Sequence, residues 1–173
     1  MFTSRLLAVL VLCAAARVHG SESPGLGEPL TASDIANVDF VVMPSGEGLP
    51  DGSGTAVEGA RIFAAQCQVC HGENGVDGLN DNLSGGHGTL ASDKPKKTVG
   101  SYWPYATTLF DYVRRAMPYQ SPGTLSNDEV YALTAYLLHI NGIINDSAAM
   151  NAESLPNVKM PNRDNFVWGY RPQ

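Results

Sequence analysis

Cys67, Cys70 and His71 form the group in this 173-residue chain whose types and spacing could do chemistry. Thiols spaced in this way occur in redox disulfides, in zinc sites and in the C-x-x-C-H signature of covalent haem attachment. A redox disulfide is expected beside alternating strands and helices, but here a helical pattern precedes the motif and a glycine-rich loop follows it. A structural zinc site needs a second pair of ligands, and the sequence offers none. Haem attachment is therefore the favoured interpretation.

Each position of the motif has a chemical role in that interpretation. The two thiols add to the two vinyl groups on one edge of the porphyrin, and the imidazole of His71 reaches the iron. A thioether as sixth ligand raises the reduction potential and suits electron transfer. Met117 is the predicted sixth ligand, because it stands between two predicted helices and before the stiff Pro118. Met160 has the same Met-Pro arrangement in the tail, and a histidine or an open position are the remaining alternatives.

The first twenty residues predict export. Arg5 precedes the apolar run "LLAVLVLCAAA", and small residues follow up to Gly20. This is the pattern of a signal peptide cleaved after Gly20, so we expect a periplasmic protein. An uncleaved anchor is the alternative, but the run is shorter than the about 20 apolar residues that span a bilayer. After cleavage we expect no membrane span, and export agrees with haem attachment, which takes place outside the cytosol.

The charge of the chain narrows the classes of partner. The net charge is −6, and loss of the leader with Arg5 and Arg17 makes the mature chain more acidic still. An acidic exported domain argues against nucleic acid and against anionic membrane surfaces as partners. Its remaining cysteines are Cys67 and Cys70, so none is left for a stapling disulfide framework.

Hydrophobic periodicity predicts three main helices, at residues 55–67, 103–117 and 126–142. Capping boxes mark the first and third helices, with Thr55 paired to Glu58 and Ser126 paired to Glu129. Pro104 suits the first turn of the second helix. We therefore expect an all-α fold.

The segments between and beyond these helices are rich in glycine and proline. Residues 72–100 predict a long loop, which a compact domain tolerates only when something fills the space it encloses. Residues 21–54 are predicted to be an extended N-terminal arm. Residues 143–173 are predicted to wrap the surface without a regular element. Three helices make a thin core, which a large apolar cofactor would complete.

C-x-x-C-H on the first helix, the "MP" loop and the capped last helix together resemble a class I cytochrome c over about residues 55–142. The resemblance implies three main helices around one covalently bound haem c, with long loops and extended arms. Its haem-binding residues would be Cys67, Cys70, His71 and Met117, with His71 and Met117 as the iron ligands.

A narrower resemblance covers nearly the whole mature chain. It rests on the segments "GLPDGSGTAVEGARIFAAQCQVCHG", "TVGSYWPYATTLFDYVRRAMP", "LSNDEVYALTAYLLHINGII" and "MPNRDNF". These are similar to the haem subunits of bacterial periplasmic sulfite dehydrogenases and to the cytochrome part of sulfane dehydrogenase. The resemblance implies an electron-transfer subunit that is not itself an enzyme. A separate molybdenum-containing, sulfite-oxidising subunit would supply single electrons, which pass to a downstream cytochrome or oxidase.

Two other functions stay open from the residues alone. The chain could be a general soluble periplasmic electron carrier. With the methionine ligand absent or labile, it could be a gas-binding haem sensor or enzyme.

Several side chains could meet the anionic propionates of a haem. Four possible donors are Trp103, Tyr105, Arg114 and Arg115. Core packing of Trp103 is an equal alternative, and for the two arginines simple solvation is favoured. The basic run at 94–97 is interpreted as a solvated face.

Overall fold

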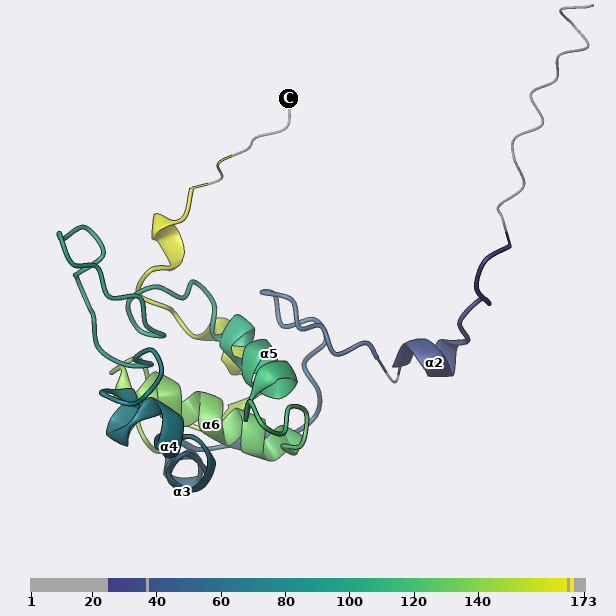
Figure 1. Cartoon of the computed structure of the whole chain (residues 1–173), viewed down its shortest axis with the longest axis horizontal. Helices are drawn as coiled ribbons and strands as arrows, with labels where there is room; N and C mark the ends of the chain where they lie inside the picture. Colours follow the sequence, from purple (N-terminus) through teal and green to yellow (C-terminus); the bar gives the residue numbers. More distant parts are fainter. Residues whose placement is uncertain (1–24, 37, 168, 170–173) are drawn as a thin grey trace, which may run out of the picture. The chain divides into compact units, whose positions relative to one another are not determined.

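The computed structural model describes residues 25–36, 38–167 and 169 (Figure 1). The predicted signal peptide over residues 1–20 lies outside the described residues. The chain divides between Asp39 and Phe40 into two compact units. Within the described ranges, none of the helices combines the length and the apolar character needed to cross a membrane.

The described part of the first unit contains one short helix, α2 (Ala32–Ala36). Thr31 and Asp34 stabilise its start reciprocally. The N–H of Asp34 donates to the Thr31 hydroxyl at 3.2 Å, and the N–H of Thr31 donates to the Asp34 carboxylate at 2.9 Å. These bonds satisfy backbone donors that the first turn of a helix leaves free.

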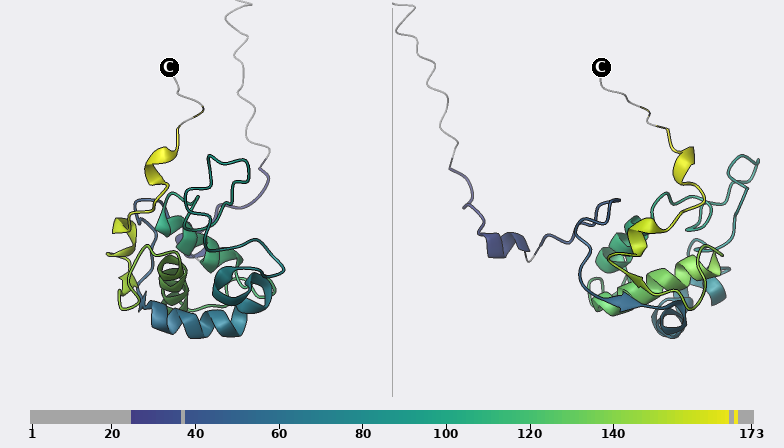
Figure 2. Two further views of the ribbon diagram at one scale, coloured as in Figure 1. Left: turned by 90° about the vertical axis from the view of Figure 1, so that its left-hand side faces the viewer. Right: turned by 180° about the vertical axis from the view of Figure 1, so that it is seen from behind.

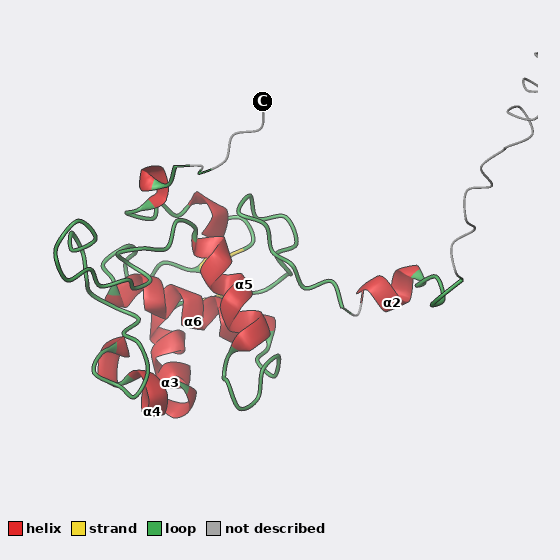
Figure 3. Ribbon diagram, turned by 45° about the horizontal axis from the view of Figure 1, so that its top comes forward, coloured by secondary structure: helices red, strands yellow, loops and turns green. Residues whose placement is uncertain are grey.

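The second unit holds the predicted helices, coloured by type in Figure 3. In chain order its elements are β1 (Ser53–Gly54), α3 (Ala56–Gln66), α4 (Gln68–His71), η1 (Glu73–Gly75), α5 (Ala106–Ala116), α6 (Asn127–Ile140), β2 (Met150–Asn151), η2 (Leu155–Asn157) and η3 (Arg163–Asn165), where η marks a 3-10 helix. The three main helices α3, α5 and α6 lie where hydrophobic periodicity predicts them.

Both capping boxes predicted from the sequence are confirmed. The Glu58 N–H donates to the Thr55 hydroxyl at 3.4 Å, and the Thr55 N–H donates to the Glu58 carboxylate at 2.8 Å. Ser126 and Glu129 make the same pair of bonds, at 3.3 and 2.8 Å. Each box satisfies two backbone donors at a helix start, so α3 and α6 begin where their local sequence directs.

The prediction that Pro104 occupies the first turn of the second helix is wrong. Helix α5 begins at Ala106, and Tyr105 before it has an extended backbone, with φ −138° and ψ 134°. The ring of Tyr105 lies under the guanidinium of Arg163 from the tail, 5.3 Å from ring centroid to guanidinium carbon. The extended Tyr105, which separates Pro104 from the helix, is therefore in contact with Arg163 of the tail.

Helix α6 is the centre of the second unit. Figures 1 and 2 show it between α3 and α5, and both helices pack on it. Every residue from 130 to 138 is buried. β1 and β2 also contact α6, so strands as well as helices cover it.

Two glycines allow this close packing around Ala132 of α6. A Cβ added to Gly59 of α3 would lie 2.5 Å from the carbonyl carbon of Ala132 and 2.8 Å from Cβ of Tyr136. A Cβ added to Gly54 of β1 would lie 2.6 Å from Cα of Ala132. Real Cβ atoms essentially never come closer than 3.0 Å to such neighbours. Glycine at both positions therefore lets α3 and β1 approach α6.

The prediction that the tail has no regular element is wrong. Strand β2 pairs antiparallel with β1, so that Gly54 lies opposite Met150, and η2 and η3 follow. Met160 is buried, with 3% of its surface exposed. The pairing joins two-residue segments about a hundred residues apart in the chain, and segments this short carry no periodic signal.

Residues 40–54 are tied to the helices of the second unit. The N–H of Val42 donates to the Asp111 carboxylate on α5 at 3.1 Å, and the Tyr131 hydroxyl on α6 donates to the Pro50 carbonyl at 2.8 Å. Only the residues before Phe40 belong to the first unit, so the N-terminal arm predicted over 21–54 spans the division of the chain.

Candidate haem site

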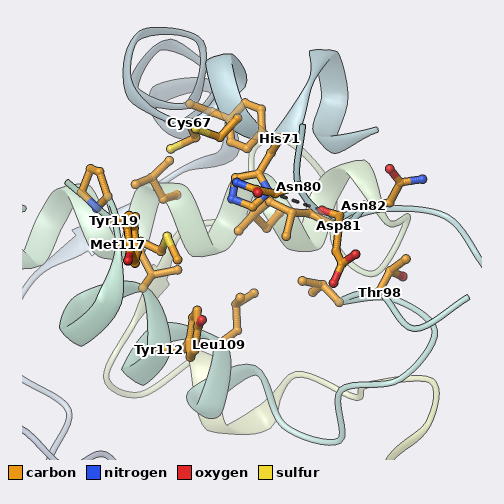
Figure 4. Close-up of a pocket in the computed structure, with 18 of the residues that line it drawn as sticks. Cys67, His71, Asn80, Asp81, Asn82, Thr98, Leu109, Tyr112, Met117 and Tyr119 are labelled. Carbon is orange, nitrogen blue, oxygen red and sulfur yellow. Dashed lines mark hydrogen bonds between the residues drawn. The ribbon is translucent and has the colours of Figure 1, made fainter. Parts of the chain in front are cut away.

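A cavity of about 1130 Å³ opens in the second unit (Figure 4). Its walls come from the end of α3 and α4, from the loop residues 79–83 and 95–99, and from α5, α6 and residues 117–120. Pockets for drug-sized ligands are typically about 300–1,000 Å³. This cavity is larger, as a macrocyclic cofactor requires, and it occupies the space that the long loop was predicted to enclose.

All four residues predicted to hold the haem line this cavity: Cys67, Cys70, His71 and Met117. Figure 4 shows Cys67 and His71 entering from one side and Met117 from another. Cys67 joins α3 to α4, and its N–H donates to the Phe63 carbonyl at 2.9 Å. The single turn of α4 therefore continues α3 and presents the motif to the cavity.

The imidazole of His71 is held by a backbone carbonyl. Its Nδ1–H donates to the carbonyl oxygen of Asp81 at 3.4 Å. This bond leaves Nε2 as the nitrogen with a free lone pair, which is the form that binds a metal. The N–H of Asn80 donates to the Cys70 carbonyl at 2.9 Å and anchors the same loop to the motif.

Two glycines let the loop after His71 fold back on the motif. Gly72 has φ +76°, and a Cβ there would lie 2.7 Å from the nitrogen of Gly78. A Cβ at Gly78 would in turn overlap the Cys70 carbonyl.

The role of Asp81 was missed by sequence reasoning, because it acts through its backbone and any residue type could supply that carbonyl.

Cys67 and Cys70 form no disulfide with each other, and both are of intermediate burial. Burial raises the pKa of the Cys67 thiol to about 11, and the neighbouring Cys70 acts in the same direction. Redox-active and nucleophilic cysteines have lowered pKa values in electropositive surroundings. Cys67 has the opposite character, which fits a thiol that ends as a thioether better than a redox disulfide.

The end of helix α5 places Met117 at the cavity. The helix ends at Ala116, and Met117 has an extended backbone, with φ −121° and ψ 147°, while its N–H donates to the Val113 carbonyl at 3.1 Å. Pro118 disfavours a helical conformation of the residue before it, which accounts for this ending. Met160, the alternative ligand, packs in the hydrophobic core and does not line the cavity.

The remaining histidine and aromatic candidates separate in the structure. Trp103 lines the cavity and packs edge-on against Tyr112, with ring centroids 5.8 Å apart. Tyr105 does not line it. His139 is half-buried off the cavity, and its Nδ1–H donates to the Ile144 carbonyl at 3.3 Å, so it serves the local structure.

The two arginines considered for the propionates are engaged elsewhere. The Nε–H of Arg115 donates to the Asp111 carboxylate at 3.1 Å. The guanidinium of Arg114 lies 5.5 Å from the ring centroid of Phe40. Neither lines the cavity, whereas Lys96 and Lys97 do. Lys96 and Lys97 are exposed, as the interpretation of the basic run as a solvated face expects, and they also border the cavity.

Apolar side chains complete the walls, contributed by α3, α5 and α6. They are Phe63, Leu109, Val113, Leu133 and Leu137. These side chains belong also to the hydrophobic core of the unit. The site thus combines two thiols, an oriented imidazole, a thioether and a broad apolar wall, which suits a haem in each respect.

A helical fold around such a cavity, with C-x-x-C-H in its wall, defines a protein of the c-type haem class. The cytochrome c family matches residues 56–141, and the chain belongs to that family. It carries covalently bound haem c in the predicted class I cytochrome c fold, and it is an electron-transfer haem protein.

Known proteins give more detailed likenesses. The crystal structure of the sulfane dehydrogenase SoxCD from Paracoccus pantotrophus is 42% identical in sequence, with a TM-score of 0.78 over 84% of this chain and 72% of that one. Photosystem II extrinsic protein V of Microcystis aeruginosa is 31% identical over 118 residues, which are 61% of this chain and 87% of that protein.

Two longer relatives match over part of their length. Thiosulfate dehydrogenase of Psychrobacter arcticus is 28% identical over 108 residues, which are 60% of this chain and 33% of that protein. The Cbb3-type cytochrome c oxidase subunit FixP of Azorhizobium caulinodans is 34% identical over 128 residues, which are 72% of this chain and 40% of that protein. The matched region thus spans well under half the length of these two relatives.

Proposed function

We propose that this protein is an exported single-electron carrier whose haem is attached through Cys67 and Cys70 and ligated by His71 and Met117. The observation that carries the proposal is the convergence of these four side chains on one large cavity. A cleaved leader is part of the proposal, and the mature protein purified after export should begin at Ser21.

The bound haem supplies an iron that changes oxidation state by one electron. The protein contributes the setting. The Asp81 carbonyl fixes the tautomer and orientation of His71. The thioether of Met117 is a neutral ligand of the kind that raises the potential relative to a second histidine. Apolar walls such as Leu109 and Leu133 keep water from the site.

The ligand assignment is tested by a pair of methionine variants. Met117→Ala should abolish the weak near-infrared absorption that a thioether–iron bond gives the oxidised protein. Met160→Ala should retain that band and instead lower the free energy of unfolding by about 2–5 kcal/mol, because it empties a buried core position. The reverse pattern of spectra would assign the ligand to the tail.

The electron donor is proposed to be a molybdenum-containing subunit that oxidises a sulfur compound. The support is the 42% identity to the sulfane dehydrogenase SoxCD across 84% of this chain, together with the resemblance of four long segments to sulfite dehydrogenase haem subunits. Electrons would then pass to a downstream cytochrome or oxidase.

The docking surface is proposed to surround the motif at Cys67 and Gln68. Three side chains on or beside the cavity are strongly exposed: Val69 (74%), Leu79 (87%) and Tyr119 (80%). Interfaces between proteins are apolar at their centre and polar at their rim. Exposed apolar side chains beside the motif therefore suit a partner that must approach the haem edge.

The partner is tested by mixing the oxidised cytochrome with its cognate molybdenum subunit and adding sulfite or a sulfane substrate separately. Rapid haem reduction with one of them is expected and also identifies the substrate. Gln68→Arg should slow this reduction without changing the haem spectrum. Asn157→Arg introduces the same charge at an exposed position off the cavity and should leave the rate unchanged.

A general electron carrier is the second candidate. It is favoured because the relatives belong to different systems, among them a thiosulfate dehydrogenase and the oxidase subunit FixP, which is 34% identical over 72% of this chain. If the haem stays oxidised with both substrates and the cognate subunit, but is reduced by several unrelated donors, this second candidate replaces the first.

A further inference from the structure

Two lysines, Lys96 and Lys97, line the cavity, and no arginine of the described part of the chain does so. The carboxylate among the lining residues is that of Asp81. A haem brings two more carboxylates, its propionates, into this space. Desolvating a carboxylate without a partner is costly, so paired cations are expected wherever the propionates lie.

Side-chain hydroxyls hold the chain at Lys96 and at Thr98, on either side of Lys97. The Lys96 N–H donates to the Thr89 hydroxyl at 3.0 Å, and the Ser101 hydroxyl donates to the Lys96 carbonyl at 2.6 Å. The Thr98 N–H donates to the Ser101 hydroxyl at 2.9 Å, and the Thr98 hydroxyl donates to the Gly85 carbonyl at 2.6 Å. Thr98 and Ser101 are buried, so this is a built segment and not a free loop.

The segment that carries the lysines reaches the side of the cavity opposite the motif. In a haem the two vinyl groups and the two propionates are on opposite edges of the porphyrin. Figure 4 shows Thr98, which follows Lys97 directly, across the cavity from Cys67. Attachment of the vinyl edge at Cys67 and Cys70 would therefore turn the propionate edge toward the segment that carries the lysines.

We propose that Lys96 and Lys97 are the positioning residues that pair with the two haem propionates. The proposal rests on covalent attachment at Cys67 and Cys70. Ammonium–carboxylate hydrogen bonds are charge-assisted and roughly twice as strong as neutral ones. The ammonium of Lys97 lies 5.0 Å from the ring centroid of Tyr102, which does not line the cavity, so pairing with a propionate would replace this contact by an ion pair.

The pairing has a consequence for the reduction potential. An uncompensated propionate stabilises the oxidised iron, which carries one more positive charge than the reduced iron. Lysines beside the propionates cancel this effect and so raise the potential. Removing them should lower it.

The test compares Lys96→Met, Lys97→Met and the double variant with Lys94→Met. Lys94 belongs to the same basic run, is exposed and does not line the cavity, so its variant makes the same change of net charge. Spectroelectrochemical titration should show the equilibrium constant for reduction falling roughly tenfold in the double variant, which is ~59 mV for one electron. Lys94→Met should shift the reduction potential much less than the double variant does. Lys96→Arg keeps the positive charge and should retain most of the potential of the unmutated protein.

Resonance Raman bending bands of the propionates provide a readout that a purely structural role would not move. They should shift in Lys96→Met and Lys97→Met and stay in place in Lys94→Met. Equal potentials in Lys96→Met, Lys97→Met and Lys94→Met, with unshifted bands, would overturn the pairing. Haem staining on a denaturing gel separates the two levels: loss of covalent haem in the unmutated protein would refute the attachment itself.

Discussion

Gly59→Ala tests the helix crossing that holds the haem-binding motif in place. Helix α3 carries Gly59 near its start and leads directly into Cys67. A Cβ at this position would lie 2.5 Å from the Ala132 carbonyl carbon and closer still to its oxygen. Because these are backbone atoms of α6, no change of rotamer relieves the overlap, and α3 must move away.

The net effect is the difference between two opposing contributions. Alanine is favoured over glycine within a helix by about 0.5–1 kcal/mol. Overpacking a tight contact costs about 1–3 kcal/mol, and contact with a backbone on a central helix places Gly59 at the upper end of that range. We expect Gly59→Ala to lower the free energy of unfolding by about 2 kcal/mol.

Urea unfolding of the haem-loaded protein, followed by far-ultraviolet circular dichroism, measures this change, since covalent haem stays attached in both states. Ala64→Gly is the control, because Ala64 is exposed in the same helix and reports propensity alone. It should destabilise by about 0.5–1 kcal/mol. If Gly59→Ala is as stable as the unmutated protein or more stable, the close crossing of α3 and α6 is refuted.

Two further predictions concern the contacts that hold residues 40–54 against the helices. Asp111→Ala leaves the Val42 N–H and the Arg115 guanidinium without their acceptor. It should lower the free energy of unfolding by about 1–3 kcal/mol. Asp111→Asn should lower it less, because the amide keeps an acceptor oxygen. Burial raises the pKa of Tyr131 from its ordinary 10.0 to about 12. The unfolded chain therefore loses the hydroxyl proton of Tyr131 at a lower pH than the folded chain does. The free energy of unfolding should fall as the pH rises from 10 to 12. Tyr131→Phe should be less stable at neutral pH, because it loses the hydrogen bond to Pro50, but should show a shallower decline over that window.

The sequence by itself determined the elements whose causes are local. Thr55 and Ser126 begin their helices through bonds to residues three positions away, and Pro118 ends α5 through its own backbone restriction. The C-x-x-C-H motif likewise has its thiols and imidazole within one helical turn. Spacing along the chain is sufficient evidence for such features, because the interacting groups are neighbours in any helical conformation.

Only the tertiary structure decided which distant residues share the cavity and which share the core. It separated Met117 from Met160, although both precede a proline, and it brought the Asp81 carbonyl to His71. In the folded chain Arg115 binds Asp111 away from the cavity, whereas Lys96 and Lys97 line the cavity. These outcomes depend on how α3, α5 and their loops pack around α6. A lysine or a backbone carbonyl has the same local sequence signal in either place, so its role follows from packing alone.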